Sequence, residues 1–435
     1  MVDRPPLSLS FICMPMVPPF LLVSQNHNHQ MLRIIASSTR RAAVGRHFSA
    51  VAEAIAEQPT SPLYMWGTDT KGCLLRPPNL ANVTKVDVPT AVSLPTVDNI
   101  TQLYCGPTDT AVVYGDGTCL VWGENKRGQL GVGHQTPVAT PTPVALPDQR
   151  QVAQVSIGSQ MGAFVDKQGD LYTCGLGGSV LTGFGLLGHG DATADKVITT
   201  PKLVESIIED GVYIKQVQVS DIHMTCLTTE GEVLTTGGGS FGRLGNFDPI
   251  DQLYLEPVEI LTNNVTDIAG GKAFTLALTN EGVIYGWGKN DKGQLGTGFG
   301  MAVDMYAMQA IPEPIEADEL LGRRVVKIAA GSHHAACITE GGELFYWGMS
   351  VHLEPYRVTE LLHTKIVDIH CGKDYTLAID EGGRMYSFGY GKTGVLGQGS
   401  VKILHQPQLM EVFQGKKVVQ ASAGWQHAAC LVEDA

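Results

Sequence analysis

The 435-residue sequence predicts an all-β fold, a seven-bladed β-propeller with four-stranded antiparallel blades. An apolar strand that ends in Trp-Gly or a similar pair recurs seven times, and its closing glycines are Gly67, Gly123, Gly175, Gly237, Gly288, Gly348 and Gly389. These glycines are 41 to 62 residues apart, a spacing that is typical of a modular array. No helix-length amphipathic pattern competes within residues 63–435, and a solenoid of β-units is the alternative fold.

One repeat shows why each unit should contain four strands. Short apolar or partly alternating segments are separated by glycines, as expected for half-buried strands joined by tight turns. Glu340-Gly-Gly342 predicts a hairpin turn, because glycine adopts positive φ angles without strain. The four expected strands of this unit cover residues 325–330, 335–338, 344–347 and 355–358.

The two ends of the array should share one blade. The array opens with third-strand sequence at 63–66 and ends with first- and second-strand sequence at 418–432. If these segments pair, the ring closes and two sheet edges are protected from other chains. We therefore expect the propeller to span residues 63–435.

The repeat resembles that of the regulator of chromosome condensation family. The pattern Trp-Gly-x-Asn-x-x-Gly-Gln-Leu-Gly is complete at 122–131 and at 287–296, and a Gly-x-x-His turn follows in several units. The resemblance implies one seven-bladed propeller. The founding member of this family exchanges guanine nucleotide on the small GTPase Ran and binds chromatin. Mitochondrial members are linked to ribosome assembly, RNA processing, respiratory complexes and exchange activity on organellar GTPases.

The first 62 residues contain no repeat. From Met31 the chain is rich in arginine, serine and alanine and has no acidic residue before Glu53, the composition of a mitochondrial transit peptide. We expect a presequence at 31–48, cleaved after Phe48, and a linker at 49–62. Residues 1–30 are either an unassigned segment or an over-extended start, with translation beginning at Met31. The expected location is the mitochondrial matrix. A nuclear or cytoplasmic location is the alternative if residues 31–48 are not a signal.

The net charge of the protein makes some classes of partner less favourable. The formal net charge is −13, and cleavage after Phe48 would leave 25 basic and 42 acidic residues, a charge of −17. Such an acidic protein is not expected to bind RNA or DNA nonspecifically, which argues against a chromatin role. No apolar run reaches the length of a membrane span without interruption by proline.

The cysteines and histidines look structural. Cys226, Cys337 and Cys430 recur at one position of the repeat, which favours small core-filling thiols in a reducing compartment. His223, His334 and His427 also share one position. The other units place Asp109, Met161, Phe274 and Tyr375 at that position, a mixture of polar and apolar residues. We therefore expect hydrogen bonds within the blades and not a metal ring.

No motif predicts an enzyme. The Gly-Gln-Leu-Gly loops lack the Lys-Ser/Thr pair of a phosphate-binding loop, and no nucleophile elbow or zinc-protease motif is present. We therefore predict no catalytic, cofactor-binding or metal-binding residues.

The candidate partner contacts are loop residues, chosen mainly where a unit differs from the repeat. The third unit has a longer loop with apolar residues that look exposed, and the fifth unit has a methionine-rich loop; both features suit partner binding. Basic residues in the same family of loops could meet phosphate or an acidic partner. The candidates are Leu181, Phe184, Leu186, Met301, Met305, Met308, Lys126, Arg127, Arg243, Lys289 and Lys292.

Two functions remain open from these features. The first is a non-enzymatic mitochondrial scaffold that binds protein partners in ribosome, RNA or respiratory-complex biogenesis. The alternative is an exchange factor for a small or organellar GTPase, for which the third-unit loop could act as a wedge.

Overall fold

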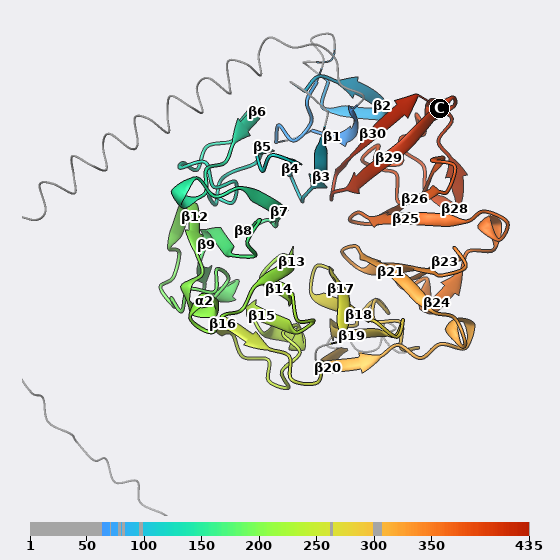
Figure 1. The fold of residues 1–435 in the computed structure, drawn as a ribbon. Helices are drawn as coiled ribbons and strands as arrows, with labels where there is room; N and C mark the ends of the chain where they lie inside the picture. Colours follow the sequence, from blue (N-terminus) through green and yellow to red (C-terminus); the bar gives the residue numbers. More distant parts are fainter. Residues whose placement is uncertain are drawn as a thin grey trace, which may run out of the picture. The chain divides into compact units, whose positions relative to one another are not determined.

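The structure is a computed structural model that describes residues 63–69, 71–76, 80, 83–94, 99–261, 264–298 and 307–434. The expected presequence, the segment before it and the linker at 49–62 lie outside the described residues. Seven four-stranded antiparallel sheets surround a common centre (Figure 1), which confirms the predicted propeller. We number the blades in the order of the repeat, and blade 1 is the one that closes the ring.

The strands of blades 2 to 4 follow one another along the chain, from the inner edge of each blade outward. Blade 2 contains β3 (Ile100–Cys105), β4 (Asp109–Tyr114), β5 (Cys119–Gly123) and β6 (Val138–Pro143). Blade 3 contains β7 (Val152–Ile157), β8 (Met161–Asp166), β9 (Leu171–Leu176) and β12 (Val197–Leu203). Blade 4 contains β13 (Ile214–Val219), β14 (His223–Thr228), β15 (Val233–Gly237) and β16 (Gln252–Pro257).

Blades 5 to 7 repeat this order. Blade 5 contains β17 (Val265–Gly270), β18 (Phe274–Thr279), β19 (Ile284–Lys289) and β20 (Met308–Pro314). Blade 6 contains β21 (Val325–Ala330), β22 (His334–Thr339), β23 (Leu344–Gly348) and β24 (His352–Arg357). Blade 7 contains β25 (Ile366–Cys371), β26 (Tyr375–Asp380), β27 (Met385–Gly389) and β28 (Leu404–Leu409).

Among the residues that the structure describes, helical structure is confined to short connections between blades or strands. They are η2 (Pro147–Gln149), α2 (Glu205–Glu209), η3 (Ser240–Gly242), η4 (Asp318–Leu320), η5 (Thr359–Leu361) and η6 (Glu411–Phe413). Among the described residues, none of these helices could reach across a bilayer. A small extra hairpin, β10 (Gly178–Ser179) with β11 (Gly183–Phe184), projects from blade 3.

Blade 1 joins the two ends of the array, as the sequence predicts. It contains β29 (Lys416–Ala423), β30 (His427–Asp434), β1 (Leu63–Thr68) and β2 (Lys85–Val92). In the register of the central pair, Leu63 lies opposite Leu431 and Gly67 opposite His427. The seam of the ring is therefore an ordinary antiparallel ladder at the middle of a sheet.

The tryptophans of the repeat join neighbouring blades. Each indole is fully buried, and its N–H donates to a backbone carbonyl in the long loop of the preceding blade. The pairs are Trp66 with Val395 (2.7 Å), Trp122 with Cys73 (2.8 Å), Trp287 with Arg243 (3.0 Å) and Trp347 with Gln294 (3.0 Å). A Cβ on Gly296 would lie 2.8 Å from Nε1 of Trp347. The Trp-Gly and Gly-Gln-Leu-Gly halves of the motif therefore form one contact between blades.

The recurring histidines form a second contact between blades. Nε2 of His427 lies 2.8 Å from the Thr110 hydroxyl of the next blade. His223 and His334 make equivalent hydrogen bonds of 3.1 Å to threonines of their next blades. All three rings are buried, and the expected structural role is confirmed.

The cysteines of the described residues are free thiols, and most of them are buried. Cys226, Cys337 and Cys430 have no exposed surface, and burial raises their pKa. They fill the core of their blades, as the repeat position predicts.

Candidate interaction face

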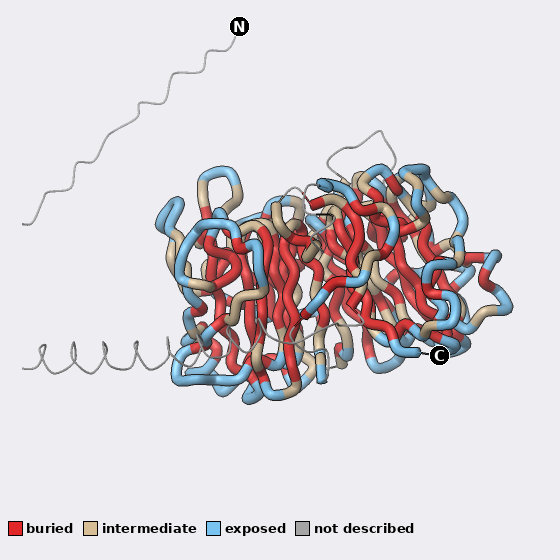
Figure 2. The backbone as a smooth tube through the Cα atoms, turned by 90° about the horizontal axis from the view of Figure 1, so that it is seen from above, coloured by how far each residue is buried: buried red, intermediate tan, exposed pale blue. Residues whose placement is uncertain are grey.

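The antiparallel order of the strands gives the ring two faces. The loop face carries the turn between the first two strands of each blade and the longer loop between the last two, which in blade 2 are residues 106–108 and 124–137. The turn face carries the hairpin turns and the connections between blades, which in blade 2 are residues 115–118 and 144–151. Exposed segments gather at both rims, and buried strands fill the space between them (Figure 2).

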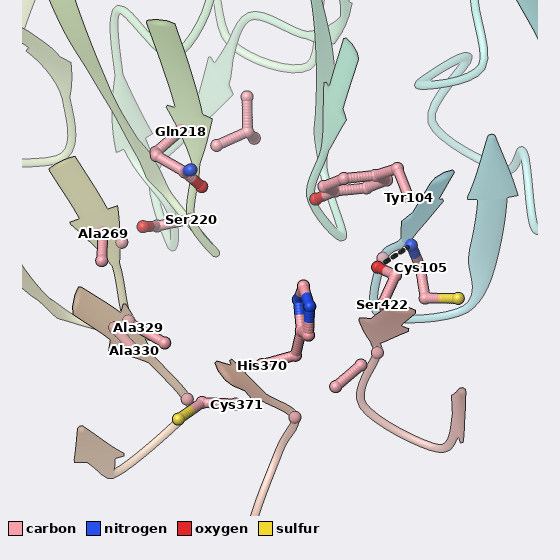
Figure 3. A pocket seen from close by; sticks show the side chains of 18 of the residues that line it. Tyr104, Cys105, Gln218, Ser220, Ala269, Ala329, Ala330, His370, Cys371 and Ser422 are labelled. Atoms are coloured by element: carbon pink, nitrogen blue, oxygen red, sulfur yellow. Dashed lines mark hydrogen bonds between the residues drawn. The ribbon is translucent and has the colours of Figure 1, made fainter. Parts of the chain in front are cut away.

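A central channel lies between the innermost strands. Its cavity measures about 560 Å³ and is lined by the first strands of the blades and the turns that follow them. His370 points into this cavity, with Tyr104, Gln218 and Ser220 around it (Figure 3). Among the described residues, no group of three or more His, Cys, Asp or Glu side chains is placed to hold a metal ion.

Side chains at one position of the inner strands connect several pairs of neighbouring blades. The Gln102 amide donates to the carbonyl of Val155 (3.0 Å) and accepts from its N–H (2.8 Å). Gln216 makes the same pair of bonds to Ile268, at 3.0 and 3.2 Å. These bonds satisfy backbone groups at the edges of the inner strands, so the channel lining stabilises the ring.

Charged residues replace the glutamines at the same position of blades 5 to 7. Lys327 of blade 6 makes an ion pair with Asp368 of blade 7, and His370 lies 3.2 Å from the other oxygen of that carboxylate. Burial acts to raise the pKa of Asp368, but His370 and Lys327 outweigh it and hold the pKa well below its usual range. These charged groups are paired with one another within the ring.

Four of the predicted basic contacts lie at the surface of the loop face. Lys126 and Arg127 are exposed in blade 2, and the Lys126 ammonium lies 3.6 Å from Glu124. Lys292 of blade 5 is exposed. Lys289 is half-buried and pairs with Asp291 at 2.8 Å, so its charge is already neutralised.

Arg243 and Leu186 are buried, which corrects the expectation that they are free to touch a partner. Arg243 is 4% exposed, its Nε donates to the Ser240 carbonyl (2.6 Å), and burial lowers its pKa to about 10. Leu186 has no exposed surface. Both residues stand where other blades have the glutamine of Gly-Gln-Leu-Gly, a position that faces the junction with the next blade.

The long loop of blade 3 forms the β10–β11 hairpin. At its tip Val180 is 85% exposed and Leu181 is 95% exposed. Phe184 is half-buried, and its N–H donates to Oδ2 of Asp251 in blade 4 at 2.9 Å. Of the methionines, Met308 is 47% exposed on β20, whereas Met301 and Met305 lie outside the described residues.

Sequence reasoning missed the neighbouring loop of blade 4. Phe247 is 64% exposed and Ile250 is 67% exposed. Phe247 also has a positive φ of 71°. The sequence does mark this loop. In Gly242-Arg-Leu-Gly-Asn-Phe247 a phenylalanine occupies the position that is glycine in other blades, at Gly133 and Gly298.

Comparison with known proteins identifies the family. Residues 62–430 match the model of the RCC1-like domain, so the chain belongs to this family of propellers. The crystal structure of Prp20p from Saccharomyces cerevisiae, described with its binding to Gsp1p and histones, superposes with a TM-score of 0.75 at 22% identity and covers 88% of this chain and 93% of that one.

Three relatives are similar in sequence. The human E3 ubiquitin-protein ligase HERC2 is 29% identical over 86% of this chain, which spans 6% of that protein. The mitochondrial RCC1 domain-containing protein RUG3 of Arabidopsis thaliana is 30% identical over 54% of the chain and 51% of its own length. The secretion-regulating guanine nucleotide exchange factor of Bos taurus is 30% identical over 54% of the chain and 48% of its own length. The chain thus spans about half or less of these relatives.

Proposed function

We propose that the protein is a non-enzymatic scaffold that acts in the mitochondrial matrix and binds protein partners through its loop face. The observation that carries the proposal is a rigid ring that presents exposed apolar residues, Val180, Leu181, Phe247 and Ile250, on one face. Exposed apolar side chains that gather at one place mark interaction sites. The composition of residues 31–48 and the similarity to a mitochondrial relative support the location. Ribosome or respiratory-complex biogenesis is the proposed setting.

A native pull-down of the tagged full chain from isolated mitochondria tests this function. Recovery of ribosomal or respiratory subunits that persists after nuclease treatment would support the scaffold. Recovery that disappears with nuclease would indicate RNA as the bridge. A fusion of residues 31–60 to a fluorescent reporter tests the location separately, and a diffuse cytoplasmic signal would contradict it.

A second candidate function is guanine nucleotide exchange on a small or organellar GTPase. The specific observation in its favour is the β10–β11 hairpin, a projection with an apolar tip that could press on a nucleotide-binding loop. The similarity to an exchange factor of Bos taurus adds support. In this case the pull-down should recover one GTPase, more strongly when nucleotide is removed. Replacing Val180 and Leu181 by serine should abolish release of a fluorescent guanine nucleotide from that GTPase.

A further inference from the structure

The four exposed apolar residues of the loop face come from loops of two neighbouring blades, and these loops are hydrogen-bonded to each other. Asp251 joins the two loops, because Oδ2 accepts from the N–H of Phe184 (2.9 Å) and Oδ1 accepts from the N–H of Gly239 (3.0 Å). The hairpin also touches blade 4 directly, since a Cβ on Gly238 would lie 2.7 Å from the Thr182 carbonyl. We call Val180, Leu181, Phe247 and Ile250 the apolar corner.

The fold requires a left-handed backbone at position 247, where the Phe247 N–H donates to the Ala310 carbonyl of blade 5 (3.2 Å), but it does not require a phenylalanine there. The φ of Phe247, 71°, lies in the left-handed region, where a bulky L-residue is an outlier. The equivalent position is glycine in four other blades, with similar φ angles at Gly133, Gly190, Gly298 and Gly399. Glycine would therefore serve the turn without strain.

The Phe247 side chain is not buried enough to offset this strain. A phenylalanine that filled a cavity could offset the cost by hydrophobic transfer, but Phe247 keeps 64% of its surface exposed. The blade-4 loop also holds Phe241, at a φ of 64°, so both phenylalanines with positive φ angles among the described residues lie here. Strained residues persist where they serve a function, and an exposed aromatic side chain is a common anchor in protein interfaces.

Charges around the apolar corner indicate the chemistry of its partner. Asp248 follows Phe247, and Asp195 lies at the base of the hairpin, where its N–H donates to the Gly178 carbonyl (2.8 Å). Both residues are exposed, and neither makes an ion pair with any described residue. The nearby Lys196 is already paired with Asp191. The corner is thus apolar with two free negative charges at its border.

We infer that the apolar corner binds a protein segment whose apolar side chains are flanked by lysine or arginine. Apolar contact would supply the affinity, and the pairing of Asp195 and Asp248 with basic residues would select the segment and its orientation. A membrane surface fits less well, because free carboxylates are repelled by anionic lipids. This inference rests on the proposed scaffold function and names the kind of partner that the loop face would hold.

Site-specific photo-crosslinking in mitochondria tests the inference with the full-length protein. A benzophenone amino acid replaces Ile250 in one variant and Leu321 in the control variant. Leu321 is 81% exposed but lies between blades 5 and 6 on the turn face. We expect crosslinks from position 250 to map to an apolar segment with basic residues beside it. Yield no greater than that from position 321, or crosslinks to lipid or to an acidic segment, would overturn the inference.

The variant Phe247→Gly tests partner binding without disturbing the fold. We expect it to reduce the crosslinking yield from position 250 about tenfold, as for loss of an anchor residue, without lowering the melting temperature. The double variant Asp195→Asn, Asp248→Asn should weaken crosslinking and reduce its sensitivity to salt. If the pull-down recovers the same partners with and without Phe247→Gly and crosslinking is unchanged, the apolar corner is not the site, while the scaffold function stands. If the wild-type chain recovers no partner, the scaffold function fails as well.

Discussion

At the scale of single residues, polar groups that are buried between blades make the ring sensitive to pH. Burial lowers the pKa of His334 and His427 to about 4, so both rings are neutral in the folded protein at physiological pH. Each neutral ring bonds a threonine of the next blade. Protonation would place a positive charge at a buried junction between blades, which is costly.

We therefore expect His334 and His427 to contribute less to the free energy of unfolding as the pH is lowered from 7 to 5. An unfolded histidine has a pKa of 6.5, above the folded value of about 4 for His427, so the unfolded state takes up the proton first. The contribution of His427 is complete above pH 6.5 and is lost between pH 6.5 and 4, by about 1.4 kcal/mol per pH unit. Urea unfolding at the two pH values measures it. His427→Gln should show a smaller loss by about 2 kcal/mol, and an equal loss would contradict the assignment.

Phe247→Gly should stabilise the protein or leave its stability unchanged. It removes left-handed strain worth about 1–2 kcal/mol, although glycine increases the entropy of the unfolded chain by about 0.4–1 kcal/mol. The net expectation is a gain of up to about 1 kcal/mol in urea unfolding. A clear loss of stability would show that Phe247 packs productively in the free protein, contrary to its exposure.

At the scale of elements, long loops contact the tryptophan of the next blade wherever that blade has one. This contact explains why the Trp-Gly pair and the glycine-containing loop recur together along the chain. Trp287 and Trp347 each meet a glycine of the preceding loop, at 2.9 Å from a Cβ on Gly245 and 2.8 Å from a Cβ on Gly296. Three junctions have no tryptophan on the later blade. In two of them Cys174 and Thr236 donate to the preceding loop instead, and the third has Phe388 at this position. The loop can therefore accept a smaller donor without losing the junction.

Gly296→Ala should destabilise the protein more than the same change at Gly322. Both positions have positive φ angles, 68° and 74°, so both substitutions carry strain of about 1–2 kcal/mol. Only Gly296 has a neighbour in the way, the Trp347 indole at 2.8 Å, whereas nothing lies within 4 Å of a Cβ at Gly322. We expect an additional loss of about 1–3 kcal/mol at Gly296 by urea unfolding. Equal losses in the free energy of unfolding would mean that the Trp347 indole can move to make room for the added Cβ.

At the scale of the whole molecule, the ring depends on the pairing of its two ends. Strand β30 is hydrogen-bonded to β29 on one side and to β1 on the other. Its residues 427–432 are all buried. The seam also carries the bonds from His427 to Thr110 and from Tyr375 to the His427 carbonyl, which link blade 1 to both neighbours.

Removing residues 421–435 should therefore open the ring. We expect a melting temperature lower by at least about 5 °C, the effect of losing several kcal/mol from a large domain, or loss of cooperative unfolding. A truncation after Val432 is the matched control, because it removes only residues 433–435 and Glu433 and Asp434 are exposed. Similar melting temperatures for the two truncations would contradict closure through β30.

Local sequence patterns are sufficient to predict the propeller, the number of blades and the closing blade. The reason is that strand length, turn glycines and the Trp-Gly pair are local features that repeat along the chain. The shared position of His223, His334 and His427 also predicted a structural role, because residues repeated in register occupy equivalent places in their blades.

The sequence pattern does not predict which loop residues reach the surface, because their exposure depends on the packing of neighbouring blades. Leu186 and Arg243 look like free loop residues in the sequence, yet both are buried at junctions between blades. Leu181 and Phe247 lie on different blades, and Asp251 brings their loops into one surface. Exposure depends on contacts between segments that are far apart in the chain, and the local pattern that predicts a strand or a turn carries no information about those contacts.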